Sequence, residues 1–255
     1  MILEVQDLAV SFGGVAALGG VSFTVEPGSI TSLIGPNGAG KTTAFNAITG
    51  FLAPGRGDVR YGARSVVGLR PCDIAARGIV RTFQKTSVFS QLSARDNILI
   101  GLHRQGHATA WRILLASRRV AREEARLARE AEDLLELTGL AHRQDLLADA
   151  LPYGEQRLLE LAIALAARPT LLLLDEPAAG MTASEKGAVT GLIQQIRAQG
   201  VTILLVEHDM RLVMGISDHV VALNCGRVIA AGSPEAVRRH PEVIRAYLGA
   251  SSAIE

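Results

Sequence analysis

The sequence predicts an α/β fold, and three observations support this prediction. A glycine-rich loop at residues 35–43 follows a run of strand type at 29–34 and leads directly into a helical run. Two further runs, 171–174 and 201–206, are apolar apart from Thr202, which is typical of strands buried on both faces of a parallel sheet. Between the first and last of these strands, residues 90 to about 165 have helical periodicity.

Composition limits the classes of protein to which the chain can belong. Its 255 residues suit one large domain or a core with a sizeable insertion, and 48% hydrophobic residues are enough for a packed α/β core. The net charge of +1 gives no indication of a nucleic-acid partner. Cys72 and Cys225 lie far apart and form no CxxC pair, so we expect free thiols in a cytosolic protein.

The N-terminus has neither a basic region nor a long apolar run, so we expect no secretory signal. No apolar run reaches the roughly 18 residues that are needed to span a bilayer. If the protein works at a membrane, we therefore expect it to do so through a partner.

The N-terminal part of the chain is predicted to be rich in β-strand. Polar and apolar residues alternate at 3–10 and again at 21–25, where a Pro-Gly turn closes the second run. A short β-rich stretch follows at 58–61, and 78–83 is predicted to be a buried strand that ends at Gln84.

The loop between the strand at 29–34 and the helix at 42–48 fits the spacing G-x-x-x-x-G-K-[ST] of a phosphate cradle. Its glycines let backbone N–H groups approach an anion, and the following helix points its positive end at the same place. Lys41 can reach β- and γ-phosphates, and the Thr42 hydroxyl suits Mg²⁺. A glycine-rich turn with a chance lysine would not need this strand–loop–helix frame.

The middle of the chain is predicted to form amphipathic helices. Its apolar positions near helical spacing are Trp111, Leu114, Leu115, Ala121, Ala125, Ala128, Ala131 and Leu135. Arg119–Glu123 and Arg126–Glu130 have the i,i+4 spacing of helical ion pairs. The Arg-rich face from Arg112 to Arg129 is either a docking surface or, as ordinary surface composition favours, a solvated helix face. Further on, Ser233-Pro234 predicts the start of a helix.

Two carboxylates follow the buried strand at 171–174. Ligands of a parallel sheet lie at the carboxyl ends of its strands, which is where Asp175 and Glu176 are expected. Asp175 is then placed to hold Mg²⁺, directly or through water, and Glu176 to orient and deprotonate an attacking water. A carboxylate here could instead cap the next helix, but its combination with the phosphate loop favours a chemical role.

Polar residues also end two other predicted strands. His208 follows the run at 201–206 and could donate to a γ-phosphate, although a lone histidine at a strand end is usually structural. Gln84 could bond Mg²⁺ or the attacking water, and alone it would indicate little.

The order of these pieces carries more information than any one of them. With its phosphate loop, Gln84, helical region, Asp175-Glu176 and His208, the chain resembles the nucleotide-binding subunit of an ATP-binding cassette (ABC) transporter over essentially its whole length. The resemblance implies a P-loop NTPase core with an N-terminal antiparallel β subdomain and an inserted helical subdomain.

In that arrangement residues 1–255 form one ATP-binding domain. Residues 1–90 and 165–255 would be the β-rich P-loop core, and about 90–165 the helical subdomain that carries the family signature.

The resemblance also implies roles for single residues and the cofactors ATP and Mg²⁺. Lys41 takes the Walker A position and Gln84 the Q-loop position. Asp175 and Glu176 match Walker B and the catalytic glutamate, and His208 matches the switch histidine. The implied metal site consists of Thr42, Gln84 and Asp175. The implied ATP-binding residues are Phe12, Asn37, Gly38, Ala39, Gly40, Lys41, Thr42 and Thr43, with the Phe12 ring stacked on adenine unless it is a core aromatic.

The family signature, usually Leu-Ser-Gly-Gly-Gln, presents a helix N-terminus to the γ-phosphate bound on an opposing subunit. Here it consists of Leu151, Pro152, Tyr153, Gly154 and Glu155. Gly154 and the following helix keep the dipole, whereas Pro152 removes the serine hydroxyl and one N–H, and Tyr153 adds bulk. After Glu176, Ala178-Ala179-Gly180-Met181 replaces the usual Ser-Ala-Leu-Asp. These departures do not affect nucleotide binding by Lys41. They concern the nucleotide site of the opposing subunit, to which the signature segment contributes.

A closer resemblance accounts for the departures. The runs at 151–162, 175–180, 207–214 and 241–249 are similar to the ATP-binding subunits of high-affinity branched-chain amino acid (LIV-type) uptake systems. This implies ATP hydrolysis that drives uptake of branched-chain amino acids. The alternative is uptake of urea or of another amide or amino acid, because the urea-uptake ATPases are near relatives.

The same resemblance implies the partners and the location. The partners are integral-membrane permease subunits, a second ATP-binding subunit and, indirectly, a periplasmic or extracellular solute-binding protein, without nucleic acid. The chain would lie peripherally at the cytoplasmic face of the inner (plasma) membrane.

Two alternatives stay open at this point. The second ATPase is either identical or different, and the altered signature favours a heterodimer. A soluble ATP-dependent switch without a permease belongs to another functional class, but such proteins usually carry two cassettes, and this chain has one phosphate loop. No residue indicates the solute, because a cassette contacts only ATP and the permease.

Overall fold

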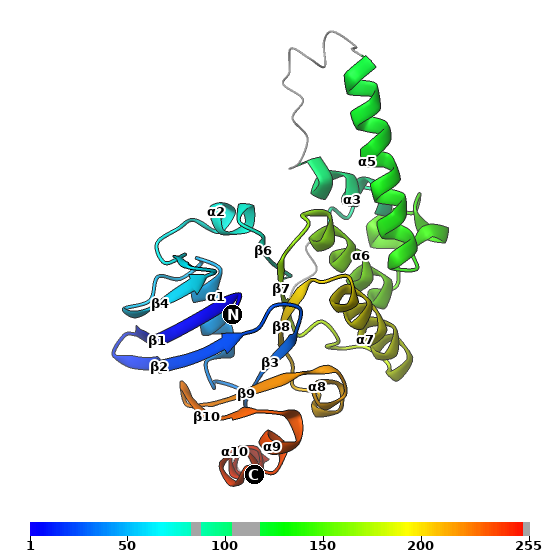
Figure 1. Cartoon of the computed structure of the whole chain (residues 1–255). Coiled ribbons are helices and arrows are strands. Elements are labelled where there is room, and N and C mark those ends of the chain that lie inside the picture. The colour runs from blue at the N-terminus through cyan, green and yellow to red at the C-terminus, as the bar shows by residue number, and fades with distance from the viewer. Residues whose placement is uncertain (83–87, 104–117, 252–255) are drawn as a thin grey trace. The chain divides into compact units, whose positions relative to one another are not determined.

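The computed structural model of the chain describes residues 1–82, 88–103 and 118–251 (Figure 1). The chain divides into two compact units. The first contains Met1–Arg81, Thr170–Ala179 and the chain from Ile193 onward, and the second contains the described parts of Thr82–Pro169 together with Gly180–Leu192. The α/β class is confirmed, while the predicted subdomain boundaries near residues 90 and 165 stay a prediction.

The first unit is built on a six-stranded sheet with the order β10-β9-β3-β8-β7-β6. The five strands from β9 to β6 are parallel, and β10 pairs antiparallel with β9. The strands are β3 (Ile30–Ile34), β6 (Ile79–Arg81), β7 (Leu171–Asp175), β8 (Thr202–Val206), β9 (His219–Asn224) and β10 (Arg227–Gly232). Every residue of β3, β7 and β8 is buried, as the sequence predicts for these three runs, although Thr31, Ser32, Asp175 and Thr202 are polar.

Alternate side chains of this sheet enter two different cores, because successive strand residues point to opposite faces. Leu33 and Leu223 pack with helix α1 (Lys41–Ile48) and the N-terminal strands. Ile34 and Ala222 pack on the other face with residues of three short helices. Those helices are α8 (Met210–Ile216), α9 (Pro234–Arg238) and α10 (Pro241–Ser251).

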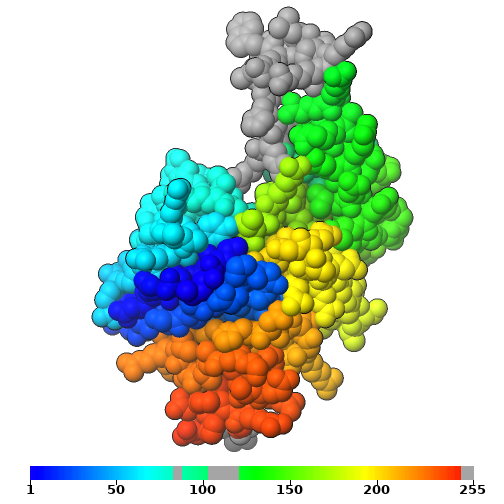
Figure 2. Space-filling model, viewed as in Figure 1, coloured from blue at the N-terminus to red at the C-terminus, as the bar shows by residue number. Residues whose placement is uncertain are grey.

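A second, antiparallel sheet of the first unit has the order β2-β1-β4-β5. Its strands are β1 (Leu3–Phe12), β2 (Val15–Val25), β4 (Arg56–Tyr61) and β5 (Arg64–Ser65), and helix α2 (Pro71–Ala76) follows. Gly13 and Gly14 both have positive φ, at 52° and 87°, as a two-residue type I′ turn between β1 and β2 requires. Strand β2 and the β9–β10 turn lie side by side (Figure 2), where the Gly19 N–H donates to the Gly226 carbonyl at 2.8 Å.

The second unit is helical. It contains α3 (Ala94–His103), α5 (Arg118–Leu137), α6 (Tyr153–Ala166), the 3₁₀ turns η1 (Ala141–Arg143) and η2 (Ala148–Ala150), and the first part of α7 (Ala183–Ala198). Leu127, Ala131 and Leu135 of α5 are buried at i, i+4 and i+8 and belong to one apolar cluster with residues of α3 and α6. No helix in the described residues is both long enough and apolar enough to cross a membrane.

Some residues at the predicted helical spacing are exposed, and others fall outside the described residues. Ala121 and Ala125 are exposed, because at 3.6 residues per turn they lie to one side of the stripe through Leu127. Trp111, Leu114, Leu115, Arg112 and Gln84 lie outside the described residues.

Other sequence predictions for single contacts are confirmed. The predicted Arg126–Glu130 ion pair forms, with 2.7 Å between Nη1 and Oε1. The predicted helix start at Ser233 is also present, since the Ser233 hydroxyl accepts from the Ala236 N–H. The strand predicted at 78–83 ends earlier, at Arg81.

Candidate functional site

The phosphate loop joins β3 to α1, and its last glycine starts the helix. Gly40 has φ 102° at the N-cap of α1. A Cβ at this position would lie only 2.7 Å from Leu18 Cδ2 and 2.8 Å from the Ala17 carbonyl oxygen, so only glycine fits. The Ala39 carbonyl accepts from the Gly226 N–H at 3.0 Å, which fixes the loop to the β9–β10 turn.

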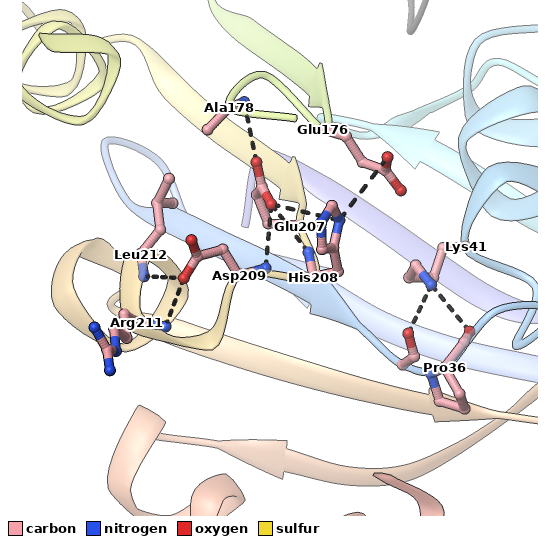
Figure 3. A network of polar contacts seen from close by, with 10 residues as sticks. Pro36, Lys41, Glu176, Ala178, Glu207, His208, Asp209, Arg211 and Leu212 are labelled. Carbon is pink, nitrogen blue, oxygen red and sulfur yellow. Dashed lines mark hydrogen bonds and ion pairs between the residues drawn. The ribbon is translucent and has the colours of Figure 1, made fainter. Parts of the chain in front are cut away.

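Lys41 is the first residue of α1 and is only 8% exposed. Its Nζ donates to the carbonyl oxygens of Gly35 at 2.7 Å and Pro36 at 3.0 Å (Figure 3). Burial lowers the pKa of Lys41, and the carboxylates of Glu176 and Asp175 act against this shift. The ammonium is therefore held inside the loop, and the two carboxylates that the sequence predicts for the site favour its charged form.

Asp175 and Glu176 lie at the carboxyl end of β7. Asp175 is 4% exposed, and its Oδ2 accepts from Arg81 Nη2 at 2.7 Å. The Glu176 N–H continues the sheet by donating to the Val206 carbonyl at 2.9 Å. Glu176 has φ 49°, a left-handed conformation that is unusual for a non-glycine residue and is often found at functional sites.

His208 follows β8 and lies beside Glu176. Its Nδ1 is 3.9 Å from Glu176 Oε2, too far for a hydrogen bond but close enough to form one after a small side-chain rotation. The imidazole is 59% exposed, so a ligand can reach it. Figure 3 shows His208 and Glu176 side by side, with Lys41 drawn in the same view.

The remaining predicted nucleotide residues also belong to the first unit. Phe12 is 52% exposed at the tip of the β1–β2 hairpin, so it is not a core aromatic. Asn37, Gly38 and Thr42 are exposed, whereas Ala39 is buried. Gln84 lies outside the described residues.

The second unit carries the signature segment, Leu151 to Glu155. Pro152 is the N-cap of α6 and makes no side-chain capping bond. Tyr153 is 43% exposed, and its hydroxyl accepts from Arg157 Nε at 3.1 Å. Glu155 lies in the first turn, where its charge suits the helix dipole, and pairs with Arg143 at 3.3 Å. The segment thus starts a helix, as the sequence predicts.

The comparisons with known proteins agree with this geometry. Residues 18–179 match the family model described as ABC transporter, and 227–253 match the model described as branched-chain amino acid ATP-binding cassette transporter. A high-affinity branched-chain amino acid transport ATP-binding protein, BraF of Pseudomonas aeruginosa, is 44% identical, with 97% of this chain and 98% of that protein covered. This chain belongs to the ABC transporter family.

Further relatives of this ABC cassette are similar over the same length. The branched-chain amino acid transport ATP-binding protein LivG of Escherichia coli K12 is 42% identical, again with 97% and 98% of the two chains covered. The crystal structure of the ADP conformation of MJ1267, an ATP-binding cassette of an ABC transporter, superposes with a TM-score of 0.85 at 32% identity. The superposition covers 97% of this chain and 98% of the MJ1267 chain.

The structure of the cassette adds Glu207 to the site, which sequence analysis missed. Glu207 is 1% exposed and accepts from the N–H groups of Ala178, His208 and Asp209, at 3.1, 3.0 and 3.3 Å (Figure 3). It joins the segment after Glu176 to the segment that carries His208. The sequence signal that could have identified Glu207 is its position directly after the mostly apolar strand β8.

Glu185 was also missed, although Thr182-Ala183-Ser184-Glu185 is a capping-box sequence. Glu185 accepts from the Thr182 N–H at 2.8 Å and from its hydroxyl at 2.7 Å. The Gly154 N–H of the signature segment donates to the same carboxylate, and these bonds, Thr182 first, lower the pKa of Glu185. One carboxylate therefore caps α7 and also binds the N-terminus of α6.

Proposed function

We propose that this chain is the ATP-hydrolysing subunit of an ABC importer for branched-chain amino acids. Family membership and ATPase chemistry rest on the full-length similarity to transport ATP-binding proteins. The solute rests on the names of those relatives and on the C-terminal match at 227–253. The observation that carries the site is the position of Lys41, Asp175 and Glu176 after the carboxyl ends of β3 and β7, two strands of one parallel sheet.

In this proposal ATP lies over the phosphate loop. Backbone N–H groups of residues 37–43 and the Lys41 ammonium hold the phosphates, and the Phe12 ring stacks on adenine. The exposed position of Phe12 supports this role, since a stacking ring must be open to solvent before the nucleotide arrives. Stacking of this kind contributes roughly 1–3 kcal/mol by analogy with base stacking.

The residues present also fit Mg²⁺, which would neutralise charge that develops on the phosphate oxygens. Asp175, Thr42 and Gln84 are the proposed protein ligands, directly or through water. The described residues contain no group of three or more His, Cys, Asp or Glu side chains that could hold a metal by itself. Asp175 offers one carboxylate, and Mg²⁺ usually takes one or two carboxylates and completes its shell with phosphate oxygens and water.

Hydrolysis follows from the two groups at the ends of β7 and β8. A water oxygen attacks the γ-phosphorus in line while the bond to the β–γ bridging oxygen breaks, and Glu176 accepts the water proton. Lys41 and His208 donate to the γ-phosphate oxygens as charge develops on them. The 3.9 Å between His208 and Glu176 lets both groups act on the same phosphate.

We further propose that the signature segment acts on the nucleotide of a second ATP-binding subunit, and that this subunit is a different chain. The altered residues at 152 and 153 support the heterodimer, with a homodimer as the alternative. Permease subunits would hold the pair at the cytoplasmic face of the membrane, and a solute-binding protein would act through the permease.

Two variants test the ATPase part. Lys41→Ala should abolish ATP binding in a nucleotide titration, whereas Lys186→Ala, which removes another of the chain's three lysines, should bind like the unchanged protein. Glu176→Gln should bind ATP and stop turnover, with Glu235→Gln as the matched control on α9. Full hydrolysis by Glu176→Gln would contradict the role of Glu176 as base.

The solute is tested in proteoliposomes that contain this chain, the second ATPase and the permease subunits. ATP-dependent uptake of leucine, isoleucine or valine is the expected result. Uptake of urea instead would overturn the assignment of the solute and leave the ATPase assignment in place. Hydrolysis without any permease partner that binds would favour the soluble switch.

A further inference from the structure

Arg81 is a buried cation at the carboxyl end of β6. In the sheet, β7 and β8 lie between β6 and β3, the strand that leads into the phosphate loop. Its side chain is 6% exposed and that of Asp175 is 4% exposed, with 2.7 Å between Nη2 and Oδ2. Both charged groups are therefore shielded from water. A buried ion pair of this kind is little screened by salt, and its geometry decides how strong it is.

The other side of the Arg81 guanidinium contacts α1, the helix that begins at Lys41. Nη1 donates to Asn46 Oδ1 at 2.7 Å and lies 3.4 Å from Thr49 Oγ1. The guanidinium carbon lies 5.4 Å from the centre of the Phe45 ring, within cation–π range. One side chain thus connects β6, β7 and α1, all of them in the first unit.

A planar guanidinium has its donors in a fixed fork, so it can bond a carboxylate and a side-chain amide at the same time in one defined orientation. With Asn46 and Phe45 fixing its plane, Arg81 fixes the rotation of the Asp175 carboxylate. Carboxylates that bind metals depend on such outer partners, whose loss typically lowers metal affinity about 10–100-fold.

We propose that Arg81 is a positioning residue for the metal at Asp175: it holds the carboxylate in its metal-binding orientation and ties it to the helix that follows the phosphate loop. This inference rests on the proposed function, because it requires Asp175 to be the Mg²⁺ ligand. Arg81 would then support the metal site without contacting either the nucleotide or the metal.

The experiment compares Arg81→Met, Arg81→Lys and the unchanged protein. Each protein is loaded with a slowly hydrolysed ATP analogue and titrated with Mn²⁺, and bound Mn²⁺ is measured by electron paramagnetic resonance. Arg81→Met should raise the apparent Mn²⁺ dissociation constant about 10-fold. Arg81→Lys should raise it less, because it keeps the charge without the fork.

Two controls separate positioning from general damage. Binding of the same analogue in EDTA should stay within about twofold in Arg81→Met, since the contacts of Arg81 to Phe45, Asn46 and Thr49 lie beyond the predicted phosphate-binding residues 37–43. Arg197→Met removes the more exposed Arg197–Asp218 pair of the same unit and should leave the Mn²⁺ constant unchanged. If Arg81→Met does not fold, Arg81→Lys carries the comparison and should still weaken Mn²⁺ binding severalfold.

An Mn²⁺ constant that is unchanged or lower in the folded Arg81 variants would overturn the inference. So would an equal loss of analogue binding in EDTA, which would indicate a merely structural role. If the unchanged protein itself binds neither the analogue nor Mn²⁺, the proposed function fails instead, so the two failures are distinguishable.

Discussion

Glu207 takes no part in the proposed hydrolysis, but it fixes the two segments that carry Glu176 and His208. Its carboxylate is buried and accepts three backbone N–H groups, from the segment after Glu176 and from the segment of His208. Bonds of this kind between a charged acceptor and backbone donors are stronger than neutral ones. The relative position of Glu176 and His208 therefore depends on a third side chain.

We predict that Glu207→Ala destabilises the protein by about 3 kcal/mol, because three N–H groups lose a charged acceptor in a buried place. Urea unfolding followed by circular dichroism measures this change. Turnover should fall as well, since His208 loses its support. Asp145→Ala, which alters an exposed carboxylate of the other unit, serves as the control. A stability equal to that of the control would contradict the role given to Glu207.

Several single residues could be predicted from the sequence because a motif fixes their place relative to a phosphate. Lys41 and Glu176 lie where that reasoning expects them, at the loop and at the strand end. Arg81 and Glu207 could not be predicted in this way. Their partners are backbone groups and a carboxylate brought close only by the folded sheet, and no spacing in the sequence records such contacts.

At the scale of elements, the start of the signature helix α6 depends on a carboxylate from another helix. Pro152 makes no side-chain capping bond, and Glu185 of α7 accepts from the Gly154 N–H. A γ-phosphate would carry the same type of charge to the same N-terminus. Glu185 thus provides an anion to α6 within one chain.

This contact has a defined pH dependence. The pKa of Glu185 is lowered below its ordinary 4.5, first by the Thr182 bonds and then by the Gly154 N–H. The stabilisation is therefore present above the unfolded-state pKa and is lost as the pH falls through the lower folded-state pKa. Glu185→Gln should lower Tm at pH 7, and this difference should shrink in acid, where the protonated acid resembles the amide.

Thermal unfolding at several pH values checks that prediction, with Glu242→Gln as a control in the first turn of α10. A Tm difference for Glu185→Gln that is the same at neutral and acid pH would contradict the role of its charge.

The elements themselves followed from the sequence to different degrees. The fully buried, mostly apolar strands β7 and β8 were predicted within a residue, because burial on both faces leaves little choice of residue. The helical spacing around α5 is confirmed, but it could not predict that Ala121 and Ala125 are exposed, since alanine fits a solvated flank as well as a core. Spacing alone cannot separate these environments.

At the scale of the molecule, the two segments that are proposed to bind nucleotide belong to different units of the chain. The phosphate loop belongs to the first unit and the signature segment to the second. A signature that serves another chain's nucleotide requires at least two chains, and a C₂-like pair then has two composite sites.

We predict that Glu176→Gln with ATP and Mg²⁺ assembles into a pair that size-exclusion chromatography with light scattering detects. If the second ATPase is a different chain, the pair should form only when that chain is added. Assembly of this chain alone would establish the homodimer, and a monomer under both conditions would contradict composite sites. Lys41→Ala, which lacks the phosphate ligand, should remain monomeric throughout.

The left-handed backbone at Glu176 has a further consequence for how the protein can change. A glycine there would relax the chain by about 1 kcal/mol, so the residue that suits the backbone is the one that removes the carboxylate. Glu176→Gly should accordingly unfold at a higher temperature than Glu176→Ala, although both would be inactive. Selection for stability and selection for turnover therefore favour different residues at the same position.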